Sequence, residues 1–277
     1  MKRIGRVTLV AGFGVVVSTA FTGAAGQTTP PAAPRAAQAR PPAAVNQLPR
    51  ASDGKPDFSG IWQAINTASW DIQDHSAALG VPPGPGVVEG NELPYVPEAL
   101  EQKKQNFAKR ATDDPGLAKC FLPGVPRATY MPYPFEIIQN TNMIGIRYTF
   151  ARAVRMIRLD GKSRDWLEGF PDFWMGDSRG KWEGDTLVVD VRKLDERSWL
   201  DHAGNFLSDA SHVVERYSPI DRDHIQYEAT IDDPKVFTRP WKMSMPLYRI
   251  IDTNAKVLDW DCRWYLDTEK YKDAKPK

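Results

Sequence analysis

The sequence lacks most of the short motifs by which enzymes are identified. It contains no Gly-x-Gly-x-x-Gly loop, no P-loop, no Gly-x-Ser-x-Gly element, no His-x-His pair and no His-Glu-x-x-His. These absences remove the usual signs of a nucleotide site, a catalytic metal and a serine nucleophile. The sequence therefore predicts neither a cofactor nor a metal.

An excess of charge of one sign is also absent. The chain has 36 Lys and Arg against 35 Asp and Glu, whereas a nucleic-acid-binding domain normally carries a clear basic excess. A hydrophobic content of 42% and a mean hydropathy of −0.46 exclude a polytopic membrane protein and a disordered chain. Nine Trp, nine Tyr and eleven Phe are enough to build a sizeable core.

The first 26 residues have the pattern of a secretory signal peptide. Lys2, Arg3 and Arg6 precede an uncharged apolar run over residues 7–23, and small residues end at Gly26. We expect cleavage near Gly26 and a mature protein in a bacterial periplasm or outside the cell. A membrane anchor is the alternative, although the run is short for a span.

Residues 27–50 contain six Pro and seven Ala, which predicts an extended, disordered linker. A single β-rich domain is expected over residues 51–277. Its one clear helix begins at Pro97 and ends before Asp114. Most other segments indicate short strands between turn residues: 58–63, 136–139, 143–150, 153–159, 186–191, 212–217, 225–231, 241–250 and 256–262.

This spacing predicts a mostly β fold, either an antiparallel barrel of the calycin or lipocalin-like type or a sandwich, with one or two helices. The Pro- and Gly-rich stretch between Gln73 and Pro94 is expected to be a long ordered loop or a lid.

The chain has only two cysteines, Cys120 and Cys262. An even number of cysteines in an oxidising compartment favours a disulfide between them. A catalytic thiol and two unrelated buried thiols are the alternatives.

Four segments together carry a family resemblance: residues 54–62, 120–127, 182–190 and 233–241, which include Gly-Lys-Pro-Asp-Phe-Ser-Gly-Ile-Trp and Trp-Glu-Gly-Asp-Thr-Leu-Val-Val-Asp. They resemble a group of exported acidobacterial and proteobacterial proteins. That resemblance implies export and a domain boundary, and it implies no chemistry. Gly60-Ile61-Trp62 is also similar to the first strand of lipocalins, in which the Trp would plug the closed end of the barrel.

The densest cluster of polar side chains lies between residues 201 and 216 and predicts the catalytic residues Asp201, His202, Asp209, His212 and Arg216. If the face of His212 and Arg216 points into a barrel, His212 is the general acid or base, tuned by Asp209 or Asp201. Arg216 would then hold a carboxylate or a developing oxyanion. The alternative is ordinary turn chemistry beside a solvated sheet.

Aromatic residues in two Pro-containing loops predict the apolar wall of a ligand pocket, formed by Tyr130, Tyr133, Phe173 and Trp174. His75, in the long loop, would close on that site if the loop were a lid. The same aromatic residues can instead be plugs over a small β core.

These features favour an exported, cofactor-independent lyase, isomerase or hydrolase that acts on an apolar or aromatic small molecule. A non-catalytic, lipocalin-like periplasmic binding protein for a hydrophobic ligand and an envelope interaction module are the alternatives. No nucleic-acid partner and no membrane span after signal cleavage are expected.

Overall fold

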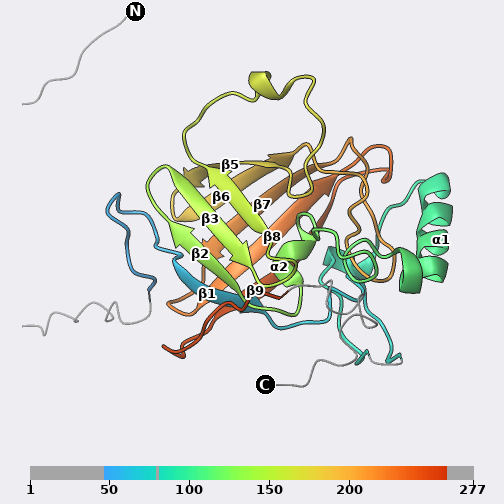
Figure 1. Ribbon diagram of the computed structural model, residues 1–277, viewed down its shortest axis with the longest axis horizontal. Coiled ribbons are helices and arrows are strands. Elements are labelled where there is room, and N and C mark those ends of the chain that lie inside the picture. Colours follow the sequence, from blue (N-terminus) through green and yellow to red (C-terminus); the bar gives the residue numbers. More distant parts are fainter. Residues whose placement is uncertain (1–46, 79–80, 261–277) are drawn as a thin grey trace, which may run out of the picture. The chain divides into compact units, whose positions relative to one another are not determined.

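The computed structural model describes residues 47–78 and 81–260, and nine β-strands within them close into a barrel (Figure 1). The strands are β1 (Gly60–Ala64), β2 (Phe135–Gln139), β3 (Met143–Tyr148), β4 (Val154–Arg158), β5 (Asp177–Glu183), β6 (Thr186–Arg192), β7 (His212–Pro219), β8 (His224–Asp232) and β9 (Trp241–Arg249). The prediction of a mostly β barrel is confirmed, and the sandwich alternative is not formed.

Sequence neighbours pair in order around the barrel. Every pair is antiparallel except β4 with β5, which run parallel and share only the partners Ile157↔Ser178 and Arg158↔Arg179. The ring closes where β1 pairs with β9 through Trp62↔Arg249. The barrel is therefore of mixed type. The parallel pair forms because the β4–β5 connection returns along the outside of the barrel to the end at which β4 began.

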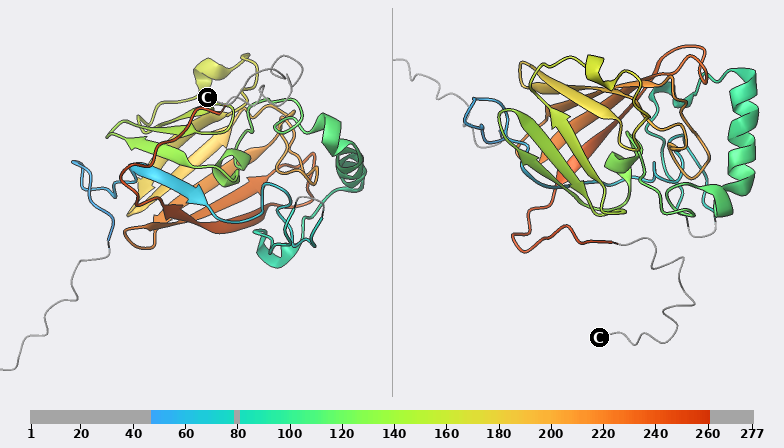
Figure 2. Two further views of the ribbon diagram at one scale, coloured as in Figure 1. Left: turned by 60° about the horizontal axis from the view of Figure 1, so that its bottom comes forward. Right: turned by 45° about the horizontal axis from the view of Figure 1, so that its top comes forward.

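The two ends of the barrel differ in their connections. Tight turns at 140–142, 184–185 and 220–223 lie at one end, whereas the long connections 65–134, 193–211 and 233–240 gather at the other. Helix α1 (Pro97–Asp113) stands at this loop end (Figure 2). The short helices are α2 (Arg127–Tyr130), η1 (Glu89–Asn91) and η2 (Asp165–Leu167). Function built on loops is therefore expected at the loop end.

Alternating side chains of the strands fill the barrel interior, as the period of two requires. On β7 the interior face is Val213, Glu215 and Tyr217, all 2% exposed or less. Near the turn end, fully buried Trp62 donates its Nε1 hydrogen to the carbonyl of Phe58 at 2.8 Å. The Arg249 guanidinium lies 4.2 Å over the Trp62 ring.

Three local predictions need correction. Strand β5 was not expected, because its sequence Asp-Ser-Arg-Gly-Lys-Trp-Glu has little β propensity. Helix α2 was also missed. Residues 256–260 form no strand, only an isolated bridge at Trp260, because β9 already pairs with β8 and β1 and the closed barrel offers no free edge. The helix prediction from Pro97 is confirmed.

Several predictions concern residues outside those that the structure describes. The signal peptide, most of the linker and Cys262 are among them. Leu48 is already buried in the core, so the packed region begins within the stretch expected to be linker. No helix among the described residues is long and apolar enough to cross a membrane.

Candidate active site

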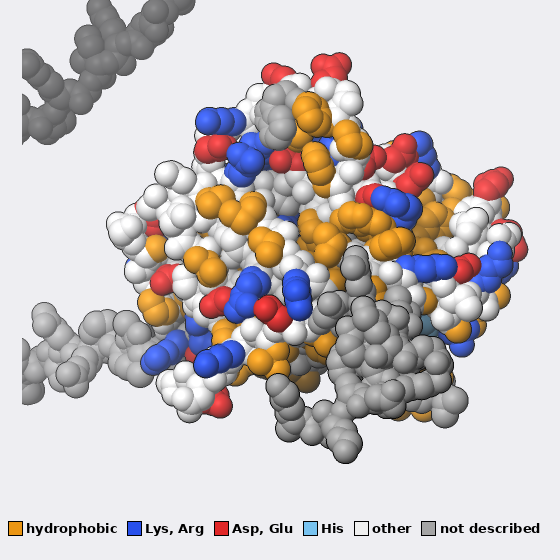
Figure 3. All heavy atoms as spheres, in the orientation of Figure 1, with side chains coloured by type: hydrophobic (Ala, Val, Ile, Leu, Met, Phe, Trp, Pro, Cys, Tyr) orange, Lys and Arg blue, Asp and Glu red, His pale blue; other side chains and the backbone are white. Residues whose placement is uncertain are grey.

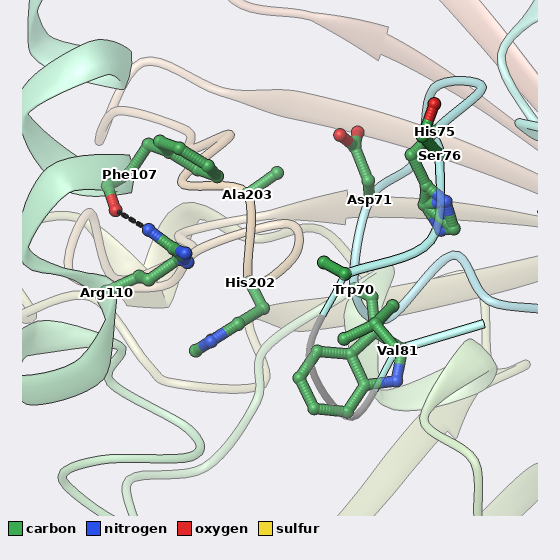
Figure 4. A pocket seen from close by; sticks show the side chains of 10 residues that line it. Trp70, Asp71, His75, Ser76, Val81, Phe107, Arg110, His202 and Ala203 are labelled. Carbon is green, nitrogen blue, oxygen red and sulfur yellow. Dashed lines mark hydrogen bonds between the residues drawn. The ribbon is translucent and has the colours of Figure 1, made fainter. Parts of the chain in front are cut away.

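A pocket of about 300 Å³ opens at the loop end of the barrel (Figure 4). Three segments line it: the connection that follows β1, helix α1 and the β6–β7 connection. Its lining residues are Trp70, Asp71, His75, Ser76, Ala78, Val81, Phe107, Arg110, His202 and Ala203. The volume is at the lower end of the range for small-molecule sites, ~300–1,000 Å³.

His202 is the pocket residue with the most defined hydrogen bonding. Its Nδ1 lies 2.8 Å from Oδ2 of Asp114, and its ring is 20% exposed whereas Asp114 is fully buried. Trp70 packs edge-on against the imidazole, with ring centroids 5.2 Å apart. The ring is therefore held on two sides.

The carboxylate of Asp114 accepts further hydrogen bonds besides the one from His202. Buried Arg127 donates two hydrogen bonds to it, Nη1 to Oδ1 at 3.0 Å and Nη2 to Oδ2 at 2.9 Å. The backbone N–H groups of Gly116 and Leu117 donate to Oδ1 as well. Burial alone would raise the pKa of Asp114, but the Arg127 charge and the hydrogen bonds from His202, Arg127 and Leu117 outweigh it and hold that pKa well below its usual value.

The ionised Asp114 sets the tautomer of His202. A carboxylate can only accept, so the imidazole carries its proton on Nδ1 and donates it to Asp114. In the neutral ring, Nε2 is then the lone-pair nitrogen, available to accept a proton. This is the arrangement by which a carboxylate orients a general base and stabilises the imidazolium that forms.

A second carboxylate, Asp201, directly precedes the pocket residue His202. It is fully buried and accepts hydrogen bonds from the backbone of Ile72 at 2.9 Å and from Asn205 Nδ2 at 2.6 Å. Burial, followed by the negative charge of Asp71, raises the pKa of Asp201 to about 7. Burial also raises the pKa of Asp71.

Asp201 and its neighbours join the loops into one unit. The Ile72–Asp201 bond and a 3.0 Å bond from His202 N to the carbonyl of Ser69 link the β1 connection to the β6–β7 connection. Asn106 of α1 donates to the carbonyl of Gly204 at 3.1 Å. The three walls of the pocket are therefore attached to one another.

The structure brings together three of the predicted residues, Asp201, His202 and His75. His202 and His75 line the pocket, and both ring nitrogens of His75 are buried without a hydrogen-bond partner among the described residues. The remaining predicted catalytic residues lie elsewhere.

The expected orientation of strand β7 is reversed. His212 and Arg216 are on the outer face of the barrel, and Glu215 is inside. His212 Nε2 lies 2.6 Å from Oδ2 of Asp190, and Arg216 pairs with Glu183 at 3.0 Å across the outer surface. Asp209 is exposed and pairs with Lys235. The prediction failed because Glu215 has a partner inside that its own segment does not reveal.

That partner is Arg155 of β4. Its Nη1 donates to Oε1 of Glu215 at 3.0 Å, Nη2 bonds Oε2, and Nε donates to Ser178 Oγ at 2.9 Å. The hydroxyls of Tyr217 and Tyr227 donate to the same Oε1. The network satisfies the buried charges, as a polar group in a barrel interior requires.

The predicted aromatic wall does not form. Tyr130 is buried and donates to the carbonyl of Leu200 at 2.8 Å, and Tyr133 packs with Phe150 and Trp260. Trp174 packs at a tilted angle on Phe121, which is 40% exposed, and lies under the Arg197 guanidinium. Tyr130 and Tyr133 therefore serve as plugs, which was the alternative, whereas Trp174 lies near the surface.

Phe173 lies on the outer surface, 38% exposed. It lines a groove with Val154 and Met156, and exposed apolar side chains gather over this face of β2–β4 (Figure 3). The groove is separate from the pocket of His202.

Several site residues were missed from the sequence. Asp114 was noted only as the point where the helix ends, and Arg127 only as part of a motif. Trp70, Phe107 and Arg110 had no signal beyond their residue type. Their partners are distant in the chain, so spacing does not reveal them. Among the described residues, no group of three or more His, Cys, Asp and Glu side chains is arranged to hold a metal ion.

Comparisons with family models, with curated proteins and with solved structures give no match to this chain. The chemistry of the site therefore has to be argued from its own geometry.

Proposed function

We propose that the protein is an exported enzyme that carries out cofactor-independent acid–base chemistry on a small molecule at the loop-end pocket. The observation that carries this proposal is the His202–Asp114 pair, in which a buried, ionised carboxylate orients an imidazole that lines a pocket. Export is supported by the sequence of residues 1–26.

In this proposal, Nε2 of neutral His202 accepts a proton from the bound substrate. The imidazolium is stabilised by Asp114, whose charge is maintained by Arg127. The same proton is then returned to the substrate at another atom or to a leaving group. Lyase and isomerase reactions share this step. In a hydrolase, Nε2 would instead take the proton from a water that attacks the substrate and pass it to the leaving group, and the geometry favours none of the three over the others.

The lipocalin-like alternative places a ligand inside the barrel. Buried side chains, including Arg155, Glu215, Tyr217 and Tyr227, occupy the interior. A binding protein would therefore use the same end pocket as the enzyme, and turnover distinguishes the two functions.

The experiment follows a panel of small aromatic acids, esters and ketones by proton NMR in D₂O, recording product formation and loss of exchangeable C–H signals. We expect turnover of at least one compound, with a loss of ~10²–10⁴-fold in His202→Gln. His212→Gln is the matched control, since that histidine is also paired with an aspartate but lies on the outer face. Turnover that survives in His202→Gln, or that is lost in the control, contradicts the proposal.

A further inference from the structure

The cation of Arg110 stands at the pocket without an acidic partner. Among residues 47–78 and 81–260, no carboxylate forms a salt bridge with it. Among the described residues of α1, Lys104 pairs with Glu101, whereas Lys103 and Lys109 form no salt bridge either; of these cations only Arg110 lines the pocket. An arginine beside a pocket with no counter-ion has donors to offer to a ligand.

The guanidinium of Arg110 is also held in place. Nη1 donates to the carbonyl of Phe107 at 2.7 Å, and Cζ lies 4.0 Å over the Phe107 ring. Figure 4 shows this side chain pointing from α1 toward the pocket. A fixed guanidinium loses less side-chain entropy when it binds a planar anion.

One aromatic ring packs against this cation and a second lines the same pocket. Phe107 is 45% exposed although it is a large apolar residue on a helix whose outer face is charged. Trp70 lines the pocket from the β1 connection and contacts His202. Exposed aromatic surface at a small pocket favours a flat, apolar ligand body.

We propose that the pocket binds a small aromatic carboxylate, with the carboxylate on Arg110 and the ring between Trp70 and Phe107. This inference rests on the proposed function, since it names the substrate class of the same site. It places the aromatic ring beside His202.

The acidic residue at the pocket, Asp71, is compatible with an anion in this orientation. Asp71 belongs to the loop wall and Arg110 to the helix wall (Figure 4), so the carboxylate end points away from Asp71. Burial raises the pKa of Asp71, and the hydrogen bond from the backbone of Gln73, followed by the positive charge of Lys103, acts in the opposite direction.

Calorimetric titration of the full chain with benzoate, and with its neutral isostere benzamide, tests the inference. We expect benzoate to bind more tightly than benzamide, and Arg110→Gln to weaken benzoate at least tenfold while leaving benzamide unchanged. Lys109→Gln, which removes the adjacent and exposed charge on α1, should change neither ligand. Phe107→Ala should weaken both ligands.

Failure of the inference and failure of the proposed function are separable. Equal affinities for benzoate and benzamide, no binding at millimolar concentration, or unchanged benzoate affinity in Arg110→Gln would overturn the substrate class. Turnover of uncharged compounds that is independent of Arg110 would overturn it as well and leave the acid–base enzyme standing. Selective benzoate binding without any turnover in the panel would support the ligand class and contradict the enzyme.

Discussion

At the scale of single residues, the described part of the chain contains two buried arginine–carboxylate pairs with different surroundings. Arg127–Asp114 lies next to the pocket and extends to His202, whereas Arg155–Glu215 lies inside the barrel and extends to Ser178 and two tyrosines. The first pair can act on a ligand through His202. The second pair has its donors occupied by protein atoms, so we assign it a structural role.

Breaking the interior pair should be costly. Glu215→Gln leaves the Arg155 charge buried without compensation, and we expect a loss of ~3–5 kcal/mol in the free energy of unfolding. Arg216→Gln, one residue further on but paired at the outer surface, should change it by less than ~1 kcal/mol. Chemical denaturation measures both, and equal effects of the two substitutions would show that the interior assignment is wrong.

The raised pKa of Asp201 predicts a pH dependence of stability. With a pKa of about 7 in the folded protein and 3.8 as its ordinary value, the native state binds more protons than the unfolded state between these two values. The free energy of unfolding should therefore fall as pH rises from about 4 to about 7, by at most ~1.4 kcal/mol per pH unit from this group. Asp114 acts with the opposite sign, but only below that range.

Asp201→Asn should remove this part of the slope. Urea denaturation at several pH values between 4 and 8 measures it, and the stability difference between wild type and variant should shrink or change sign as pH rises. The same slope in both proteins would contradict a protonated Asp201 at acidic and neutral pH.

At the scale of elements, the close packing of α1 on the β6–β7 connection forms the pocket. Gly204 has a φ of 84°, and a Cβ there would lie 2.7 Å from the backbone nitrogen of Phe107 and 2.7 Å from Asn106 Cβ. Only glycine permits this approach, and it positions Phe107 and Arg110 against His202 and Ala203.

Gly204→Ala should therefore displace α1, weaken benzoate binding and destabilise the protein by ~1–3 kcal/mol. Gly184→Ala is the control, because Gly184 also has a positive φ, 61°, but nothing lies within 4 Å of its Cβ position. It should keep benzoate affinity, since only backbone strain is added far from the pocket. Unchanged affinity in Gly204→Ala would argue against a pocket built on this contact.

Element by element, the sequence predicted segments with strong local signals. Strands β1 to β4, strands β6 to β9 and helix α1 were found, because their apolar alternation or their helix-start residue is local. Strand β5 has no such signal and forms because β6 offers it seven partners. The two faces of β7 are similarly polar, so only Arg155 on β4, far away in the chain, decides that Glu215 points inward.

The candidate site, like the strands, was predictable only where its residues give a local signal in the sequence. The Asp201–His202 segment was recognisable as a polar loop before a strand, where sites are often built. The sequence could not show that His202, and not His212, lies at the pocket. That depends on the contact of His202 with Asp114 and on which face of β7 points into the barrel. The aromatic loops were predicted as a wall, but Tyr130 and Tyr133 pack against buried residues, and Phe173 and Trp174 lie at the surface away from the pocket.

At the scale of the whole molecule, the predicted disulfide would join the helix side of the loop end to the segment after β9. Cys120 packs in a small cluster with Tyr133, Phe150 and Trp260, and Cys262 follows Trp260 by two positions. This proximity supports the Cys120–Cys262 bond, which stays a prediction because Cys262 is outside the described residues.

Thiol labelling of denatured, unreduced protein should find no reactive cysteine. Reduction should lower the melting temperature, since closure of a long loop is worth ~4–5 kcal/mol in the chain-entropy model. Double substitution of Cys120 and Cys262 by Ser should give the same lower melting temperature with or without reductant. Two labelled cysteines in the unreduced wild type would contradict the bond.

The central claim is that His202 presents a lone-pair Nε2 to the pocket while Nδ1–H is bound to Asp114. Imidazole ¹⁵N NMR of the full chain, titrated with benzoate near pH 8, measures this directly. We predict that His202 is the Nδ1–H tautomer and that its Nε2 signal shifts with benzoate, while the signals of His212 and His224 stay in place. An Nε2–H tautomer at His202, or a benzoate response at His212 in place of His202, would contradict the account.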